Sequence, residues 1–439
     1  MFNLLYKIIM KSKITILLLM MALFPSLASS AIKFGEGDYS AELGGFVKTD
    51  LFLDTRNCVE MREGAISAIP LRKLMISDND INSVTKFNIL PIETRLSLKI
   101  NAPSILGVKV GAFVETEFFG STDATINSIR MRHAYVDLSS GAHNLRVGQF
   151  WHPLNDWEVA PATVSPLTSI LFSAGLRNPQ LRYTFKANDE ISLFAAIASQ
   201  RDFTSVGPTG ASSKYLRESG IPEIGCGIKY SSDNFGVSLN ADYKVIKPMS
   251  STFFNSNKVT QINNLGTYAA SLAMRYKVDL LSFKGMLCYG QNLADFLNIS
   301  GFGIKEMTMQ NNEITEVSFT PFNQIISWLD ISYGKEMQVG VFFGYNKNLG
   351  ANDYKDALNY YSRYSTRRDI GGISIYDDVE SMLKIAPRFV QNIGKYQWGV
   401  EVEMNTANWG IITSGKGNNF KDLESVTNFR VLASFTYFL

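Results

Sequence analysis

The sequence predicts an all-β protein, a transmembrane antiparallel β-barrel of about sixteen strands. Three observations lead to this fold class: apolar and polar residues alternate along many short segments, short turns alternate with long connections, and the chain opens with a segment typical of export. The composition agrees, because 12% aromatic residues and 33 glycines beside only 13 prolines suit many twisted strands better than helices.

Residues 1–30 have the pattern of a secretory signal peptide. Two lysines precede the apolar run 14–24, and small residues follow up to a cleavage position after Ser30. The apolar run is shorter than the roughly 20 residues that a membrane anchor needs. We therefore predict export from the cytoplasm, with residues 31–439 forming the mature barrel. Translation could start at Met10 instead of the first residue.

The charge and cysteine content exclude several function classes. The predicted signal holds three of the 42 Lys and Arg and none of the 40 Asp and Glu, so the mature chain has a net charge of about −1. This balance gives no sign of a nucleic-acid partner. Cys58, Cys226 and Cys288 lie too far apart for a zinc motif or a disulfide-rich scaffold, although one disulfide could form. No cofactor is indicated.

Period-two alternation identifies the strands. After the signal no apolar run approaches 18 residues, so an integral membrane protein would have to be a barrel. Segment 235–245 places Val, Leu, Ala, Tyr and Val on one face and Ser, Asn, Asp and Lys on the other. The same alternation occurs in 108–119, 181–186, 268–277, 337–346 and 397–404.

The connections distinguish a membrane barrel from a soluble β-sandwich. Tight periplasmic turns, long extracellular loops and an even strand number are typical of outer-membrane barrels, whereas a sandwich has no reason to sort its connections. Short turns are predicted near 101–106, 139–143, 188–190, 231–235, 278–280, 334–336 and 391–396. Longer polar connections are predicted near 55–92, 120–127, 152–179, 200–222, 247–266, 291–323, 347–378 and 405–427.

The aromatic residues support a membrane-spanning wall. Tyrosines such as Tyr183, Tyr243 and Tyr333 fall towards strand ends on the apolar face, where an interfacial girdle needs amphipathic rings. Ordinary strand propensity of tyrosine is the alternative explanation. The final strand 429–439 ends the chain and resembles the insertion signal of outer-membrane barrels, although Phe438 is penultimate rather than last.

Three segments carry a family resemblance: Gly-Gly-Phe-Val-Lys at 44–48, Ile-Arg-Met-Arg-His-Ala-Tyr-Val at 129–136, and Leu-Arg-Val-Gly-Gln-Phe at 145–150. They resemble the bacterial outer-membrane porin superfamily, near its phosphate-selective and dicarboxylate-type branch. The resemblance implies a sixteen-stranded, commonly homotrimeric pore in outer-membrane lipids. It also implies that the third external loop, here 151–179, folds inward as a constriction. We therefore expect passive diffusion of small hydrophilic solutes or ions.

The inward faces predict which residues line the pore. Polar residues there would leave the lumen wet, and selectivity then depends on its charges. We assign 17 inward cations against nine acids, which predicts a mild anion preference. The alternative is that these cations simply pair with inward acids. The predicted pore-lining residues are Arg95, Arg130, Arg132, Arg146, Arg182, Glu115 and Glu117, with Asp156 and Glu158 facing the arginines from the constriction loop.

The histidines carry little chemistry. His133, His143 and His152 have no spacing that predicts a metal site, and solvated side chains are the simpler interpretation. Alternation would turn His133 towards lipid, which indicates a slip of register there.

Three other functions compete with a pore. A surface interaction or adhesion protein would use the long loops 291–323 and 347–378. An outer-membrane enzyme would need a Ser–His or acid–His site at the lipid boundary, which we do not find in the sequence. Energised import through a plugged barrel is not favoured, because the first strand leaves no room for an N-terminal plug.

Overall fold

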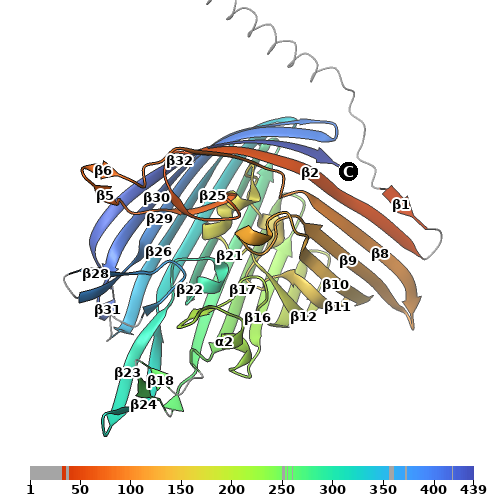
Figure 1. Ribbon diagram of the computed structural model, residues 1–439. Helices are drawn as coiled ribbons and strands as arrows, with labels where there is room; N and C mark the ends of the chain where they lie inside the picture. Colours follow the sequence, from red (N-terminus) through yellow and green to blue (C-terminus); the bar gives the residue numbers. More distant parts are fainter. Residues whose placement is uncertain are drawn as a thin grey trace, which may run out of the picture.

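The computed structural model describes residues 32–439 except 36–38, 250–252, 255, 260, 355–359, 371–372 and 418. The predicted signal peptide 1–30 lies outside the described residues. Sixteen antiparallel strands form a closed barrel (Figure 1). They are β2 (Ser40–Asp54), β8 (Arg95–Ile105), β9 (Val108–Glu117), β10 (Arg130–Ser140), β11 (His143–Trp151), β12 (Arg177–Lys186), β13 (Ile191–Ala198), β16 (Glu223–Ser231), β17 (Phe235–Ile246), β21 (Leu265–Val278), β22 (Leu281–Gln291), β25 (Asn323–Gly334), β26 (Met337–Tyr354), β29 (Ile373–Ile393), β30 (Tyr396–Ile412) and β32 (Phe420–Phe438).

Each barrel strand pairs with the next barrel strand along the chain, and the last pairs with the first. β32 runs antiparallel to β2, from the pair Phe46 and Phe438 to the pair Asp54 and Arg430. Closure removes the open edges that a sheet in lipid could not tolerate. The predicted all-β, sixteen-stranded barrel is confirmed.

The two faces of the wall differ as the alternation predicted. On β17 the outward side chains of Leu239 and Tyr243 are exposed, whereas Ser238, Asn240 and Asp242 are buried inside. An apolar outer face and a polar inner face suit a barrel surrounded by lipid. Cys58, Cys226 and Cys288 are all free thiols, so the disulfide that the sequence allowed does not form.

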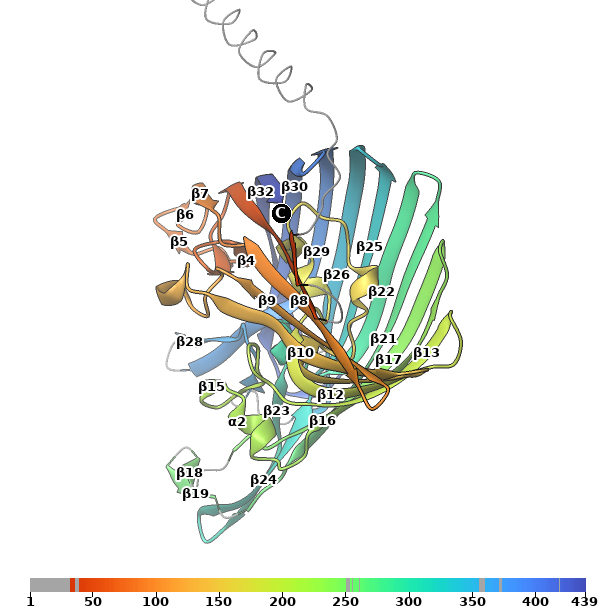
Figure 2. The same ribbon diagram turned by 90° about the vertical axis from the view of Figure 1, so that its right-hand side faces the viewer.

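The tight turns gather along one rim of the barrel and the long connections along the other (Figure 2). All seven predicted short turns are present. The long connections 347–378 and 405–427 were predicted too long. β26, β29, β30 and β32 continue well into them, because polar side chains bond within the ladder; the Thr406 and Thr427 hydroxyl oxygens, for example, lie 2.9 Å apart.

The long connections contain short elements of their own. A small four-stranded sheet of β20, β24, β23 and β27 extends beyond the barrel rim (Figure 1). No described helix is long and apolar enough to span a membrane. β1 (Ile32–Phe34) precedes the first barrel strand and pairs with it. The elements of the connections are β3 (Cys58–Met61), β4 (Ile66–Pro70), β5 (Met75–Ile76), β6 (Asn79–Asp80), β7 (Lys86–Leu90), η1 (Asp123–Thr125), η2 (Trp157–Val159), η3 (Pro166–Phe172), β14 (Val206–Gly207), β15 (Gly210–Ala211), α2 (Lys214–Arg217), β18 (Phe253–Phe254), β19 (Asn257–Lys258), β20 (Gln261–Ile262), η4 (Ala294–Phe296), β23 (Phe302–Gln310), β24 (Glu313–Pro321), β27 (Tyr360–Tyr361), β28 (Thr366–Ile370) and β31 (Gly415–Gly417).

The connection between β11 and β12, residues 152–176, lies inside the barrel (Figure 1). We call it the inner loop. Wall residues of β21 and β26 hold its backbone: Ser271 donates to the Leu154 carbonyl at 2.7 Å, and the Leu171 carbonyl accepts from Asn346 at 2.7 Å. Loop residues such as Phe172 join wall residues such as Phe342 in an apolar core. The interior is therefore only partly polar, because the loop brings apolar side chains into it.

Candidate pore-lining site

Two cavities lie on either side of the inner loop. The turn-side cavity, of about 460 Å³, reaches the tight turn at Gly141 and Ala142. The inner cavity, of about 150 Å³, lies deeper in the barrel. Both are lined by Asn155, Asp156 and Trp157, so this short stretch of the loop separates them.

A β-bulge shapes the wall of the inner cavity. The pairing of β9 with β10 shifts between Met131 and His133, so Arg132 is an extra residue in β10. Bulges re-aim side chains, and here both Arg132 and His133 become buried inside the wall. His133 packs between Phe150 and Trp151, with ring centroids 5.6 and 5.1 Å away. The register slip predicted at His133 is confirmed.

Arginines from neighbouring strands surround Glu117 in the inner cavity. Glu117 accepts hydrogen bonds from Arg130 Nε at 3.0 Å and Arg132 Nη1 at 2.6 Å, and Arg95 Nε lies 3.6 Å from the same carboxylate. Arg132 Nε also donates to Glu115 at 2.6 Å. Four predicted pore-lining residues, Arg95, Arg130, Arg132 and Glu117, line this cavity, and Glu115 binds one of them.

Arg177 is a cavity residue that the sequence reasoning missed. It lines the inner cavity, and its guanidinium carbon lies 5.3 Å from the centre of the Trp151 ring. It makes no ion pair within the described chain, and its buried Nε has no hydrogen-bond partner there. We had placed this position in the loop, but β12 begins at Arg177. The signal in the sequence that could have identified Arg177 was Trp151, which lies directly opposite Arg177 in the pairing of β11 with β12.

Arg146 and Arg182 face each other across β11 and β12. Arg146 binds both oxygens of Asp137 at 2.8 Å. Arg182 has no ion pair among the described residues, and its Nε and Nη2 are buried without hydrogen-bond partners. Its guanidinium lies 4.1 Å from the centre of the Phe194 ring. Both arginines line the turn-side cavity. Like charges directly opposite disfavour each other, so this pair suits a passing anion.

The predicted loop acids bind a cation of the barrel wall. Asp156 and Glu158 line the turn-side cavity, but both contact Lys229 of β16, at 3.1 and 2.7 Å. The transverse field that we predicted between these acids and the arginines is therefore weakened, because Lys229 compensates their charge. Lys284 also holds this stretch, donating to the Ala160 carbonyl at 2.8 Å.

Other inward cations are paired, as the alternative interpretation expected. Arg388 makes a bidentate pair with Asp330, at 2.7 and 2.9 Å. Glu93 lines the inner cavity between strands, and its carboxylate is paired with the Lys48 ammonium. Two further inward cations are paired in the same way, Lys384 with Glu403 and Arg430 with Asp54.

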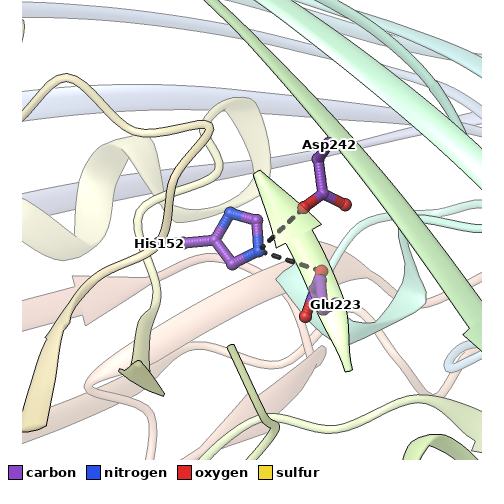
Figure 3. A group of neighbouring side chains, drawn as sticks. All are labelled: His152, Glu223 and Asp242. Carbon is purple, nitrogen blue, oxygen red and sulfur yellow. Dashed lines mark hydrogen bonds and ion pairs between the residues drawn. The ribbon is translucent and has the colours of Figure 1, made fainter. Parts of the chain in front are cut away.

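His152, Glu223 and Asp242 form a buried group at the start of the inner loop (Figure 3). The Leu154 backbone N–H donates to His152 Nδ1 at 3.1 Å, so the proton of a neutral ring is on Nε2. Nε2 then donates to Glu223 at 3.0 Å, with Asp242 4.0 Å away. A metal ion needs a free lone pair on Nε2, so this geometry favours a loop anchor over a metal site. The prediction that His152 is solvated was wrong, because it is buried.

Comparisons with known proteins agree with the barrel. The model of a family described as "DcaP outer membrane protein" matches residues 52–269. The outer membrane channel DcaP of Acinetobacter baumannii is 17% identical with a TM-score of 0.65, covering 94% of this chain and 100% of that chain. In-vitro folded OmpT of Vibrio cholerae (9% identity, TM-score 0.51) and Salmonella typhi OmpF in complex with daunomycin (10%, 0.51) each cover 93% of this chain and 100% of theirs. No curated protein matches.

Proposed function

We propose that the chain is an outer-membrane channel of the DcaP outer membrane protein family, and that small hydrophilic solutes cross it by passive diffusion with a mild preference for anions. The family match supports a channel rather than an enzyme. The buried histidine group lies inside the barrel and not at the lipid boundary, where an outer-membrane enzyme would need it.

Uncompensated arginines carry the anion preference. Arg182 in the turn-side cavity and Arg177 in the inner cavity have no carboxylate partner within the described residues. A cation in a narrow, low-dielectric passage raises the local concentration of anions. Each cavity holds one such arginine, so an anion would meet a favourable charge on both sides of the inner loop.

The assembly and orientation of the channel complete the proposal. We infer that residues 1–30 direct export and are removed, that the tight turns face the periplasm, and that three copies assemble in the membrane. The inner loop acts as the constriction, since Asn155, Asp156 and Trp157 separate the two cavities. The sorted connections and the resemblance of segments such as 44–48 to porins support these points.

Single-channel recording tests this function. Purified protein comprising residues 31–439 would be inserted in a planar lipid bilayer under a KCl gradient. We expect discrete conductance steps and a reversal potential on the chloride side. A reversal potential on the potassium side would contradict the anion preference. A folded protein that never conducts would contradict the channel itself.

Surface interaction is a second candidate, favoured by one hairpin. β5 and β6 project from the barrel (Figure 1); Met75 and Ile76 of β5 are 56 and 55% exposed, and Leu74 just before them is 52% exposed. Exposed apolar groups held by an ordered hairpin are typical of a contact surface. Replacing all three by serine should leave conductance unchanged and reduce adhesion of cells that display the protein. Unchanged adhesion would remove this candidate.

A further inference from the structure

We propose that Glu117 sets the strength of the anion preference, because it is the shared counter-ion of the arginines around the inner cavity. This inference rests on the proposed function and deepens it. An arginine cluster attracts anions only by the charge that its own carboxylates leave uncompensated. Glu117 compensates more of this cluster than any other described acid, so its charge controls the balance.

The geometry divides one carboxylate among three guanidinium groups. Oε1 of Glu117 accepts from Arg130, and Oε2 accepts from Arg132 at 2.6 Å with Arg95 at 3.6 Å. The Glu117 side chain is only 3% exposed, so water compensates little of its charge. Arg177 lines the same cavity and adds a fourth guanidinium. Glu117 therefore contacts three of the four guanidinium groups that line this cavity.

The bulge in β10 makes this arrangement possible. Regular alternation would separate the inward side chains of Arg130 and Arg132 by one outward residue and leave His133 outside. With Arg132 as the extra residue, Arg130 stays opposite Glu117 while Arg132 reaches back to the same carboxylate. Because the backbone itself directs two arginines to one acid, the shared ion pair is a built feature of the cavity wall.

Glu115 is the natural comparison within the same strand. It is also inward and binds Arg132 at 2.6 Å, but it contacts no other arginine among the described residues. Its side chain is 19% exposed, against 3% for Glu117. We therefore expect neutralisation of Glu115 to affect ion preference in the same direction but less strongly.

The test measures the chloride-to-potassium permeability ratio, from reversal potentials at low salt, for wild type and four variants. Glu117→Gln should raise the ratio about fourfold, because one unit charge at roughly 10 Å in water changes the local concentrations of chloride and of potassium each about twofold, in opposite directions. Glu115→Gln should raise it by less. Glu313→Gln makes the same chemical change in an exposed loop strand and should leave the ratio unchanged. Glu117→Asp keeps the charge and should stay near wild type.

The outcomes separate this inference from the proposed function. A wild-type channel without anion preference would overturn the proposed function. A wild-type preference that Glu117→Gln leaves unchanged, or reduces, would overturn only the role of Glu117. If Glu117→Asp raises the ratio as much as Glu117→Gln, the role of Glu117 is overturned as well, because the effect would then come from altered packing and not from the lost charge.

A charge-balanced variant keeps the test valid if Glu117→Gln does not fold. The double variant Glu117→Gln with Arg95→Gln removes one anion and one cation from the cluster, so it relieves the excess of like charge. Its ratio should lie near wild type, whereas Arg95→Gln alone should lower the ratio about fourfold. A double variant as low as Arg95→Gln alone would overturn the inference.

Discussion

Two parts of the inner wall use the same charged residue types for different purposes. The arginine wall, formed by β8 to β12, faces the two cavities, and most of its guanidinium groups share a carboxylate or lack one, although Arg146 is paired with Asp137. The paired wall, formed by β25, β26, β29, β30, β32 and β2, gives each buried cation its own acid, as in Arg388 with Asp330. We propose that the arginine wall attracts solutes, whereas the paired wall stabilises the barrel.

The inner loop explains the difference. It packs on the paired wall, where Glu401 accepts from the Val164 N–H at 3.1 Å and from the Thr168 hydroxyl at 2.6 Å. Charges covered in this way lose contact with water and must be paired locally. The arginines of β8 to β12 remain beside the cavities, so solute and water in the cavities can compensate the positive charge that no carboxylate there neutralises. Whether an inward charge stabilises the barrel or stays accessible to solute therefore depends on whether the inner loop covers it.

The largest expected effect comes from breaking a pair on the paired wall. Asp330→Ala leaves Arg388 buried without its partner, which should destabilise the barrel by about 3–5 kcal/mol. The midpoint of heat-induced unfolding in detergent would measure this. Asp330→Leu combined with Arg388→Met removes both charges and should recover most of the loss. An unchanged midpoint for Asp330→Ala would remove the distinction between the walls.

The next effect concerns the contact between the inner loop and the paired wall. Thr168→Val removes the hydroxyl that contacts both Glu401 and Glu403, at 2.6 and 3.2 Å. This should weaken the attachment of the inner loop to the paired wall by about 1–3 kcal/mol. We expect a larger single-channel conductance or more open-channel noise, because the loop is held less firmly. Thr163→Val is the matched control, since the Thr163 hydroxyl has no hydrogen-bond partner in the described chain. Equal behaviour of the two variants would contradict an anchoring role.

A smaller effect compares one cation from each wall. Arg182→Gln removes an uncompensated charge beside the turn-side cavity and should lower the chloride-to-potassium permeability ratio about twofold to fourfold. Lys384→Gln makes the same charge change on the paired wall, where Lys384 is bound to Glu403 at 2.8 Å. We expect it to alter stability and leave the ratio nearly unchanged. A similar shift in both ratios would show that the walls do not differ in their access to solute.

The smallest effect is a difference in salt dependence. Raising KCl from 0.1 to 1 M shortens the Debye length from about 10 Å to about 3 Å, so the anion preference should decline steadily. Buried pairs such as Arg388 and Asp330 are screened much less, and the unfolding midpoint should change little over the same range. If the anion preference persists unchanged at 1 M KCl, it would have to come from direct contacts between the anion and residues of the passage, and not from the electric field of the passage.

The strand order, the tight turns and the inward and outward faces could all be predicted from the sequence. These features follow from local periodicity, because a barrel wall in lipid requires every second residue to be apolar. The ends of β30 and β32 were misjudged for the same reason: their polar extensions, around Thr406 and Thr427, lack the apolar face that marks a strand, and their pairing is visible only in the ladder.

By itself the sequence determined the barrel, its strand count and most of the charged residues that face inward. Only the tertiary structure decided which charges remain uncompensated. Asp156 binds Lys229 of β16, Arg177 joins the cavity through an early strand start, and one bulge brings Arg132 to Glu117. The physical reason is that alternation is a local property, whereas an ion pair depends on the path of a loop and on residues far apart in the chain.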